Sequence, residues 1–122
     1  MTATLTLDMK KRRMRIHKQT LHLLNDPPYV YIWVNPKEKT IALCAGDEKR
    51  KDAIQINSSR EAEVYSSGLF YELRRLNRDM QDDCSYRIEG KIIKDNTVAE
   101  FNVLSVIRTQ DHKKDGKEWV KQ

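Results

Sequence analysis

The sequence predicts an α+β domain in which two pseudo-symmetric halves, each a strand, a helix and a hairpin, form an antiparallel sheet with one principal amphipathic helix. In the segment from Tyr29 to Cys44, aliphatic and aromatic residues alternate before a polar break and a second apolar run. Alternation of this kind predicts a β-hairpin. Farther along, apolar residues recur at helical spacing from Leu69, which predicts the principal helix between about Ser67 and Met80.

Shorter elements precede the first hairpin. Residues 1–9 alternate threonine with apolar residues and predict a short edge strand or a loose arm. A strand with a basic outer face is predicted from Met14 to His17. A short helix follows from Lys18, and the run Asn25-Asp26-Pro27-Pro28 ends it because proline cannot continue a helix.

The elements after the first hairpin begin with a charged loop at residues 46–52. A short strand is predicted at 53–56 and a polar connector at 57–63, ahead of the principal helix. A second hairpin is predicted at residues 86–107, because two apolar runs flank the turn Lys94-Asp95-Asn96. The last strand is therefore expected to end near Ile107.

The order of strand, helix and hairpin occurs twice. Ile16 lines up with Val64 at an offset of 48 residues, and the helices and hairpins follow in the same order. Each half, and most clearly the stretch RIHKQTLHLLNDPPYVYIWVNPKEKTIALC, resembles the swapped-hairpin SpoVT/AbrB transcription-factor unit over about residues 13–45 and 62–107. The resemblance implies that two units, usually from two chains, interleave into a DNA-binding body, and that one chain supplies both here.

Length and composition restrict the class of protein. The 122 residues are expected to form a single domain over residues 1–110, followed by a polar tail at 111–122. The formal net charge is +5 and the pI is about 9.2, which favours polyanionic partners and nucleic acid first. The two cysteines form no CxxC motif, and no apolar run reaches the about 18 residues of a membrane span. We therefore expect a cytoplasmic protein with no membrane partner.

A basic segment is the first candidate for a functional site. Clustered cations of this kind suit the phosphates of nucleic acid, with DNA favoured over RNA, as in a transcriptional regulator. Because alternate residues of a strand share one face, Arg13 and Arg15 should act together. The alternative is a solvated run that only adds charge to the surface. The segment has no acid between its cations: Lys10, Lys11, Arg12, Arg13, Arg15 and Lys18.

An aromatic strand face is the second candidate. Tyr29, Tyr31 and Trp33 alternate along the first strand of the hairpin and should share one side of it. Such a row is typically covered by a helix or an interface, and it can also stack unpaired bases. It therefore supports an alternative function, a protein-binding module such as a phage or mobile-element inhibitor or assembly factor, and a homodimer is also expected.

No catalytic or metal-binding pattern accompanies these candidates. His17, His22 and His112 have no partner at the spacing of metal ligands, and neither the paired serines nor the cysteines have an identifiable base. We therefore expect no enzymatic activity, no cofactor and no metal site.

Overall fold

A computed structural model describes residues 2–57 and 60–109 of the chain. The expected polar tail, with His112, lies outside the described residues. The elements along the chain are β1 (Ala3–Asp8), β2 (Arg13–Ile16), α1 (Lys18–Leu23), β3 (Tyr29–Asn35), β4 (Thr40–Gly46), β5 (Ile54–Gln55), β6 (Ala62–Tyr65), α2 (Ser67–Leu76), β7 (Ser85–Ile93) and β8 (Val98–Arg108).

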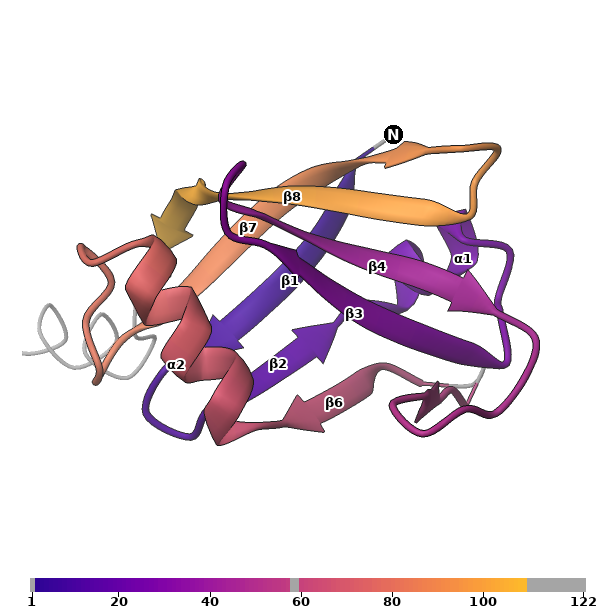
Figure 1. Ribbon diagram of the computed structural model, residues 1–122, viewed down its shortest axis with the longest axis horizontal. Coiled ribbons are helices and arrows are strands. Elements are labelled where there is room, and N and C mark those ends of the chain that lie inside the picture. Colours follow the sequence, from indigo (N-terminus) through magenta and orange to yellow (C-terminus); the bar gives the residue numbers. More distant parts are fainter. Residues whose placement is uncertain (1, 58–59, 110–122) are drawn as a thin grey trace, which may run out of the picture.

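All of these strands belong to one antiparallel sheet, with the order β5-β3-β4-β8-β7-β1-β2-β6. The sheet curls into a nearly closed barrel. In Figure 1 the β3–β4 hairpin passes in front of β1, while α2 and α1 lie toward opposite ends of the molecule. Alternate residues of each strand point into the barrel, where they form a single core.

The predicted α+β class with a principal amphipathic helix is wrong. Strands make up 47% of the structure and helices only 15%. The predicted principal helix ends at Leu76 rather than Met80, because Asn77 has extended backbone angles (φ −135°, ψ 98°). Strands from both parts of the chain pair directly with one another, β1 with β7, β2 with β6 and β4 with β8. The sheet therefore closes on itself to cover its own core, which leaves little for a helical layer to cover.

The N-terminal segment is the largest single difference from the prediction of an edge strand or loose arm. β1 lies inside the sheet, paired with β7 on one side and β2 on the other. Ala3, Leu5 and Leu7 are fully buried, whereas the residues between them are half-buried. The alternation of threonine with leucine is thus the pattern of an interior barrel strand that has one face in the core.

The observed order of elements along the chain is β1-β2-α1-β3-β4 followed by β5-β6-α2-β7-β8. The strands in the first positions of these two runs differ in length. β1 has six residues and lies between β7 and β2. β5 has two residues and pairs only with the first two residues of β3. β1 therefore has a paired strand on both sides, whereas most of β3 has one on a single side, and the barrel is open there.

A local irregularity in β8 joins the end of α2 to the sheet. The β7–β8 register shifts between Ile88 and Gly90, so that β8 bulges from its neighbour. Within the bulge, the backbone carbonyl of Val103 accepts a hydrogen bond of 2.9 Å from the side-chain amide of Asn77, which is a buried polar residue. This bond holds the residue that ends α2 against the barrel.

Replacing Gly90 by alanine tests the packing at this irregularity. A methyl group at Gly90 would overlap the carbonyl oxygen of Glu100 and the ring of Phe101. Because extra atoms in a packed core cost about 1–3 kcal/mol, we expect Gly90→Ala to lower the free energy of unfolding by about 2 kcal/mol in urea denaturation.

The matched control is Gly68→Ala in the first turn of α2, where no atom lies within 4 Å of the added methyl group. Alanine is favoured over glycine in a helix, so this variant should be unchanged or up to about 1 kcal/mol more stable. Equal losses of stability in the two variants would contradict the packing described for Gly90.

Candidate nucleic-acid interface

The predicted basic segment begins in the tight turn between β1 and β2. Lys10, Lys11 and Arg12 are all exposed there. The turn is held by a 3.1 Å hydrogen bond from the Lys11 backbone N–H to Asp8 Oδ1, and Arg12 has a positive φ of 53°. None of these cations forms an ion pair within residues 2–57 and 60–109. The turn therefore carries uncompensated positive charge.

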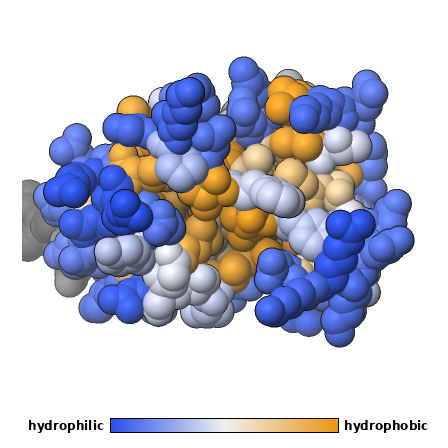
Figure 2. Space-filling model, viewed as in Figure 1, coloured by the Kyte–Doolittle hydropathy of each residue, from blue (hydrophilic) through white to orange (hydrophobic). Residues whose placement is uncertain are grey.

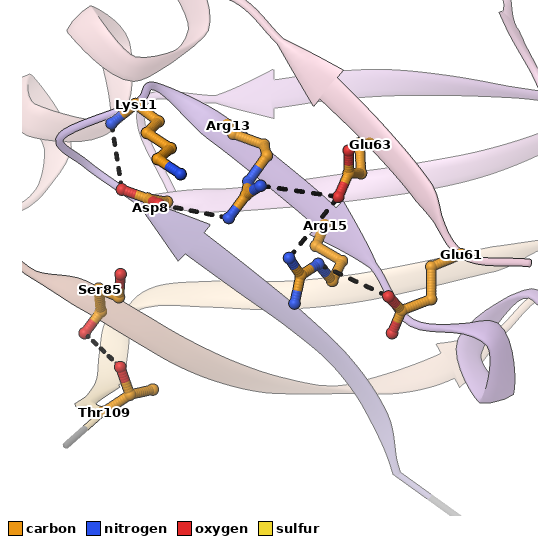
Figure 3. A network of polar contacts seen from close by, with 8 residues as sticks. All are labelled: Asp8, Lys11, Arg13, Arg15, Glu61, Glu63, Ser85 and Thr109. Atoms are coloured by element: carbon orange, nitrogen blue, oxygen red, sulfur yellow. Dashed lines mark hydrogen bonds and ion pairs between the residues drawn. The ribbon is translucent and has the colours of Figure 1, made fainter. Parts of the chain in front are cut away.

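Arg13 and Arg15 lie together on the outer face of β2, while Met14 and Ile16 between and after them point into the core. Their guanidinium groups, however, face acids of the neighbouring strands (Figure 3). The ion pairs are Arg13 with Asp8 at 3.4 Å and with Glu63 at 3.7 Å, and Arg15 with Glu61 at 3.5 Å and with Glu63 at 3.6 Å.

Charge balance decides what this face can bind. Two guanidinium groups stand among three carboxylates, those of Asp8, Glu61 and Glu63, so the face has no surplus of positive charge. A phosphate approaching here would displace an existing carboxylate and meet its repulsion. Arg13 and Arg15 are thus paired with carboxylates, and their role as phosphate ligands stays a prediction.

Sequence reasoning missed the two glutamates as part of this face. Residues 57–63 were predicted to be a polar connector, whereas β6 begins at Ala62 and pairs with β2 in the register Arg15↔Glu63. The alternation of Glu61, Ala62 and Glu63 is the signal that could have found them, since it matches a strand with one acidic face.

Lys18 is separated from the basic turn. It is the exposed first residue of α1, which follows the C-terminal end of β2, whereas the turn precedes the N-terminal end of the same strand. The predicted basic segment is thus divided into a free turn, a neutralised strand face and a remote helix start.

The basic turn contacts the start of α2, which the sequence did not predict. The Ser66 backbone N–H donates to the Arg12 carbonyl at 3.2 Å, and Arg12 Nη1 donates to Ser67 Oγ at 3.3 Å. Ser66 also caps α2, because its Oγ accepts a hydrogen bond from the Leu69 N–H at 3.1 Å. These contacts fix the turn beside the first turns of α2.

A groove of about 570 Å³ lies between the turn and α2. Apolar atoms of Met9 and Phe70 form part of its lining, and Tyr71 is 66% exposed beside them. Arg74 also lines the groove and pairs with Asp82. The groove thus combines an aromatic ring with guanidinium groups. Its full lining is Met9, Arg12, Ser67, Gly68, Phe70, Tyr71, Arg74 and Asp82.

The aromatic residues lie on the outer face of β3, the strand at the open edge of the sheet. The Tyr31 hydroxyl donates to the Glu48 carbonyl, and its ring covers Gly46 on the paired strand β4. Trp33 is 64% exposed. Tyr29 and Tyr31 are half-buried, so the row is neither covered by a helix in the described chain nor uniformly open.

The histidines and cysteines do not gather into a metal site in the part of the chain that the structure describes. His17 contacts Thr6 at 2.7 Å and Glu61 at 3.7 Å, and His22 contacts Asp26 at 2.6 Å. Cys44 and Cys84 are free thiols. Burial raises the pKa of the Cys44 thiol, and the Lys94 ammonium partly offsets that rise in pKa.

No protein-family model matches the chain, and no curated protein or solved structure is significantly similar to it. Neither helix in the described residues has the length and apolar character to span a membrane.

The thiol of Cys44 gives a measurable pH dependence. Because its pKa is raised by burial, Cys44 should carry less thiolate at neutral pH than an ordinary cysteine and react more slowly with iodoacetamide. We expect its alkylation rate, measured in a Cys84→Ser background, to continue rising at pH values above the ordinary thiol pKa.

Lys94→Asn should slow the reaction further, since it removes the ammonium that lowers the pKa of Cys44. Asparagine suits this position because Lys94 has a φ of 53°. Faster alkylation in the variant would show that the electrostatic environment of Cys44 has been misassigned.

Proposed function

We propose that this protein binds nucleic acid, DNA in preference to RNA, through a surface formed by the β1–β2 turn and the adjoining side of α2. The observation that carries the proposal is the turn itself, in which three consecutive exposed cations, Lys10, Lys11 and Arg12, have no acidic partner in the described chain. Uncompensated cations on an ordered turn are what contact with phosphates requires.

The groove beside the turn supports the same function. Arg12 is held at its rim by the hydrogen bond to Ser67, so its guanidinium group has a defined direction before any ligand arrives. Tyr71, which is 66% exposed, lines the same groove as this cation. A phosphate at Arg12 and a base against the ring of Tyr71 are compatible with one backbone segment, because aromatic rings stack on any base.

A transcriptional regulator in the cytoplasm is the biological form of this proposal, in line with what the SpoVT/AbrB resemblance implies. The net charge of +5 supports it, since a basic protein is attracted to nucleic acid over long distances. Contacts of this kind favour general binding to the phosphate backbone, and base-edge contacts would have to add any preference for sequence.

The triple variant Lys10→Ala, Lys11→Ala, Arg12→Ala tests the turn. Each lost phosphate contact removes about 0.9 from the slope of log K against log salt for duplex DNA, so the slope should fall by about 2–3. The measurement is a fluorescence anisotropy titration of labelled random duplex and single-stranded DNA at several salt concentrations.

A variant with the same change in net charge serves as the control. Lys49→Ala, Arg50→Ala, Lys51→Ala removes three exposed cations from the loop before β5, where Arg50 lies 3.9 Å from Glu48. This control should change the slope by less than about 1, since its cations are not expected to contact phosphates. Equal effects of the two triple variants would mean that binding depends only on net positive charge, which would contradict the proposal.

The double variant Glu61→Gln, Glu63→Gln tests the claim that acids mask the strand face. Without these carboxylates Arg15 loses both of its acidic partners and Arg13 keeps only Asp8, so binding should strengthen and the salt slope should rise by about 1–2. Loss of partly exposed ion pairs should lower stability by no more than about 1 kcal/mol each.

The same titration and a urea denaturation series check both expectations. Adding Arg13→Ala and Arg15→Ala to the double variant should return the slope to the wild-type value. An unchanged slope in Glu61→Gln, Glu63→Gln would show that this face lies outside the binding surface even when its cations are free.

A further inference from the structure

β3 has an open edge for most of its length. β5 pairs with β3 only at Tyr29 and Val30, so the stretch from Tyr31 to Asn35 has no strand on that side within residues 2–57 and 60–109. An open edge offers unpaired backbone N–H and C=O groups to any strand that approaches. This edge is therefore a site for intermolecular strand pairing.

The composition of β3 makes this edge unusual. The strand YVYIWVN contains no charged residue and no proline, the devices that normally keep exposed edges apart. The opposite edge of the sheet, β6, is only four residues long and carries Glu63. β6 is thus protected against pairing, whereas β3 is not.

Hydrophobic side chains continue from this edge into the open side of the barrel. Ile32 and Val34 of β3, Val64 of β6 and Leu69 of α2 are partly buried and packed against the core. Figure 2 shows hydrophobic side chains gathered on the viewed face, in the region between α2 and β3 of Figure 1. On the outer face of the same edge, Trp33 is 64% exposed. Both faces of the open stretch would gain burial from a neighbour.

We propose that a second copy of this chain pairs with β3, antiparallel and about a twofold axis. The open stretch from Tyr31 to Asn35 has Trp33 at its midpoint, so symmetric pairing over its full length places Trp33 opposite Trp33 of the second copy. Ile32 then lies opposite Val34 of the second copy, and the two sheets become continuous.

This register is self-complementary in packing and in charge. Side chains directly opposite each other on antiparallel strands have Cβ atoms about 4.5–5.5 Å apart, so the two indole rings would cover one another on the outer face. Each chain carries a formal charge of +5, and two copies therefore approach most easily along an uncharged surface. β3 is such a surface, and a second copy of the chain would pair the backbone groups of its open edge without any other partner.

The test uses the sedimentation of wild type and of two charge variants. Wild type should form a species of twice the 14.4 kDa chain mass as concentration rises. Trp33→Glu and Trp33→Lys should each be monomeric, because the twofold axis places like charges opposite each other. An equimolar mixture of the two variants should recover the dimer, since opposite charges then face one another.

The control variant is Tyr65→Glu on the protected edge β6, where the side chain is also 64% exposed. It should dimerise as wild type does. Thermal unfolding checks that the Trp33 variants fold, which is expected for a change at an exposed position. Dimers that persist in both Trp33 variants, or that are lost in Tyr65→Glu, would overturn the proposal.

Fluorescence gives a readout that needs no change at the edge. In a Trp119→Phe background, Trp33 is the remaining tryptophan, and its emission should shift to the blue as the protein is concentrated. Wild type that stays monomeric up to about 1 mM overturns the proposal. So does a blue-shifted emission that is independent of concentration, because it would mean that another part of the same chain covers β3.

Discussion

The pairing of β2 with β6 determines how the remaining parts of the surface are arranged. Its register, with Arg15 opposite Glu63 and Ile16 opposite Ala62, joins the beginning of the chain to the segment that leads into α2. The pairing continues beyond the strands through the hydrogen bond from Ser66 to the Arg12 carbonyl. The short β2–β6 pair therefore brings glutamates to the arginines of β2, and it places α2 beside the cations of the β1–β2 turn.

The two consequences have a common physical origin. On strands, charges directly opposite or diagonal to one another interact, so a strand with alternating arginines next to one with alternating glutamates becomes a closed ion-pair face. The glutamates beside β2 form no ion pair with the cations of the turn, which therefore have no acidic partner in the described chain. The function proposed for the turn therefore depends on which cations the sheet leaves without an acidic partner. It does not depend on the total number of cations in the chain.

Much of the local structure could be predicted from the sequence, because local patterns decide it. Alternation predicted the β3–β4 hairpin, and the turn Lys94-Asp95-Asn96 was predicted between β7 and β8, where all three residues have positive φ. The predicted start of the helix near Ser67 agrees with the structure, in which Ser66 caps α2. The sheet order could not be predicted, because pairings such as β1 with β7 join residues 77 to 87 positions apart and depend on packing.

The same limit explains the errors at the candidate site. The basic segment was predicted from residues near one another in sequence, whereas two of the three acids that pair with it, Glu61 and Glu63, lie in or just before β6, almost 50 residues later. Likewise, the α+β class was predicted from the clearest helix, although eight of the ten elements in the described chain are strands. Long-range pairing, which the sequence does not display, decided both outcomes.

We propose that nucleic acid contacts the β1–β2 turn and the start of α2 and avoids the paired face of β2. An NMR titration of the uniformly labelled chain with a short DNA duplex tests this claim residue by residue. Binding at the turn should give the largest amide shifts at Lys10 to Arg12 and at Ser67 to Tyr71, with small shifts at Arg15 and Glu63. Shifts centred on Arg15 and Glu63, or no shifts at low salt, would contradict it.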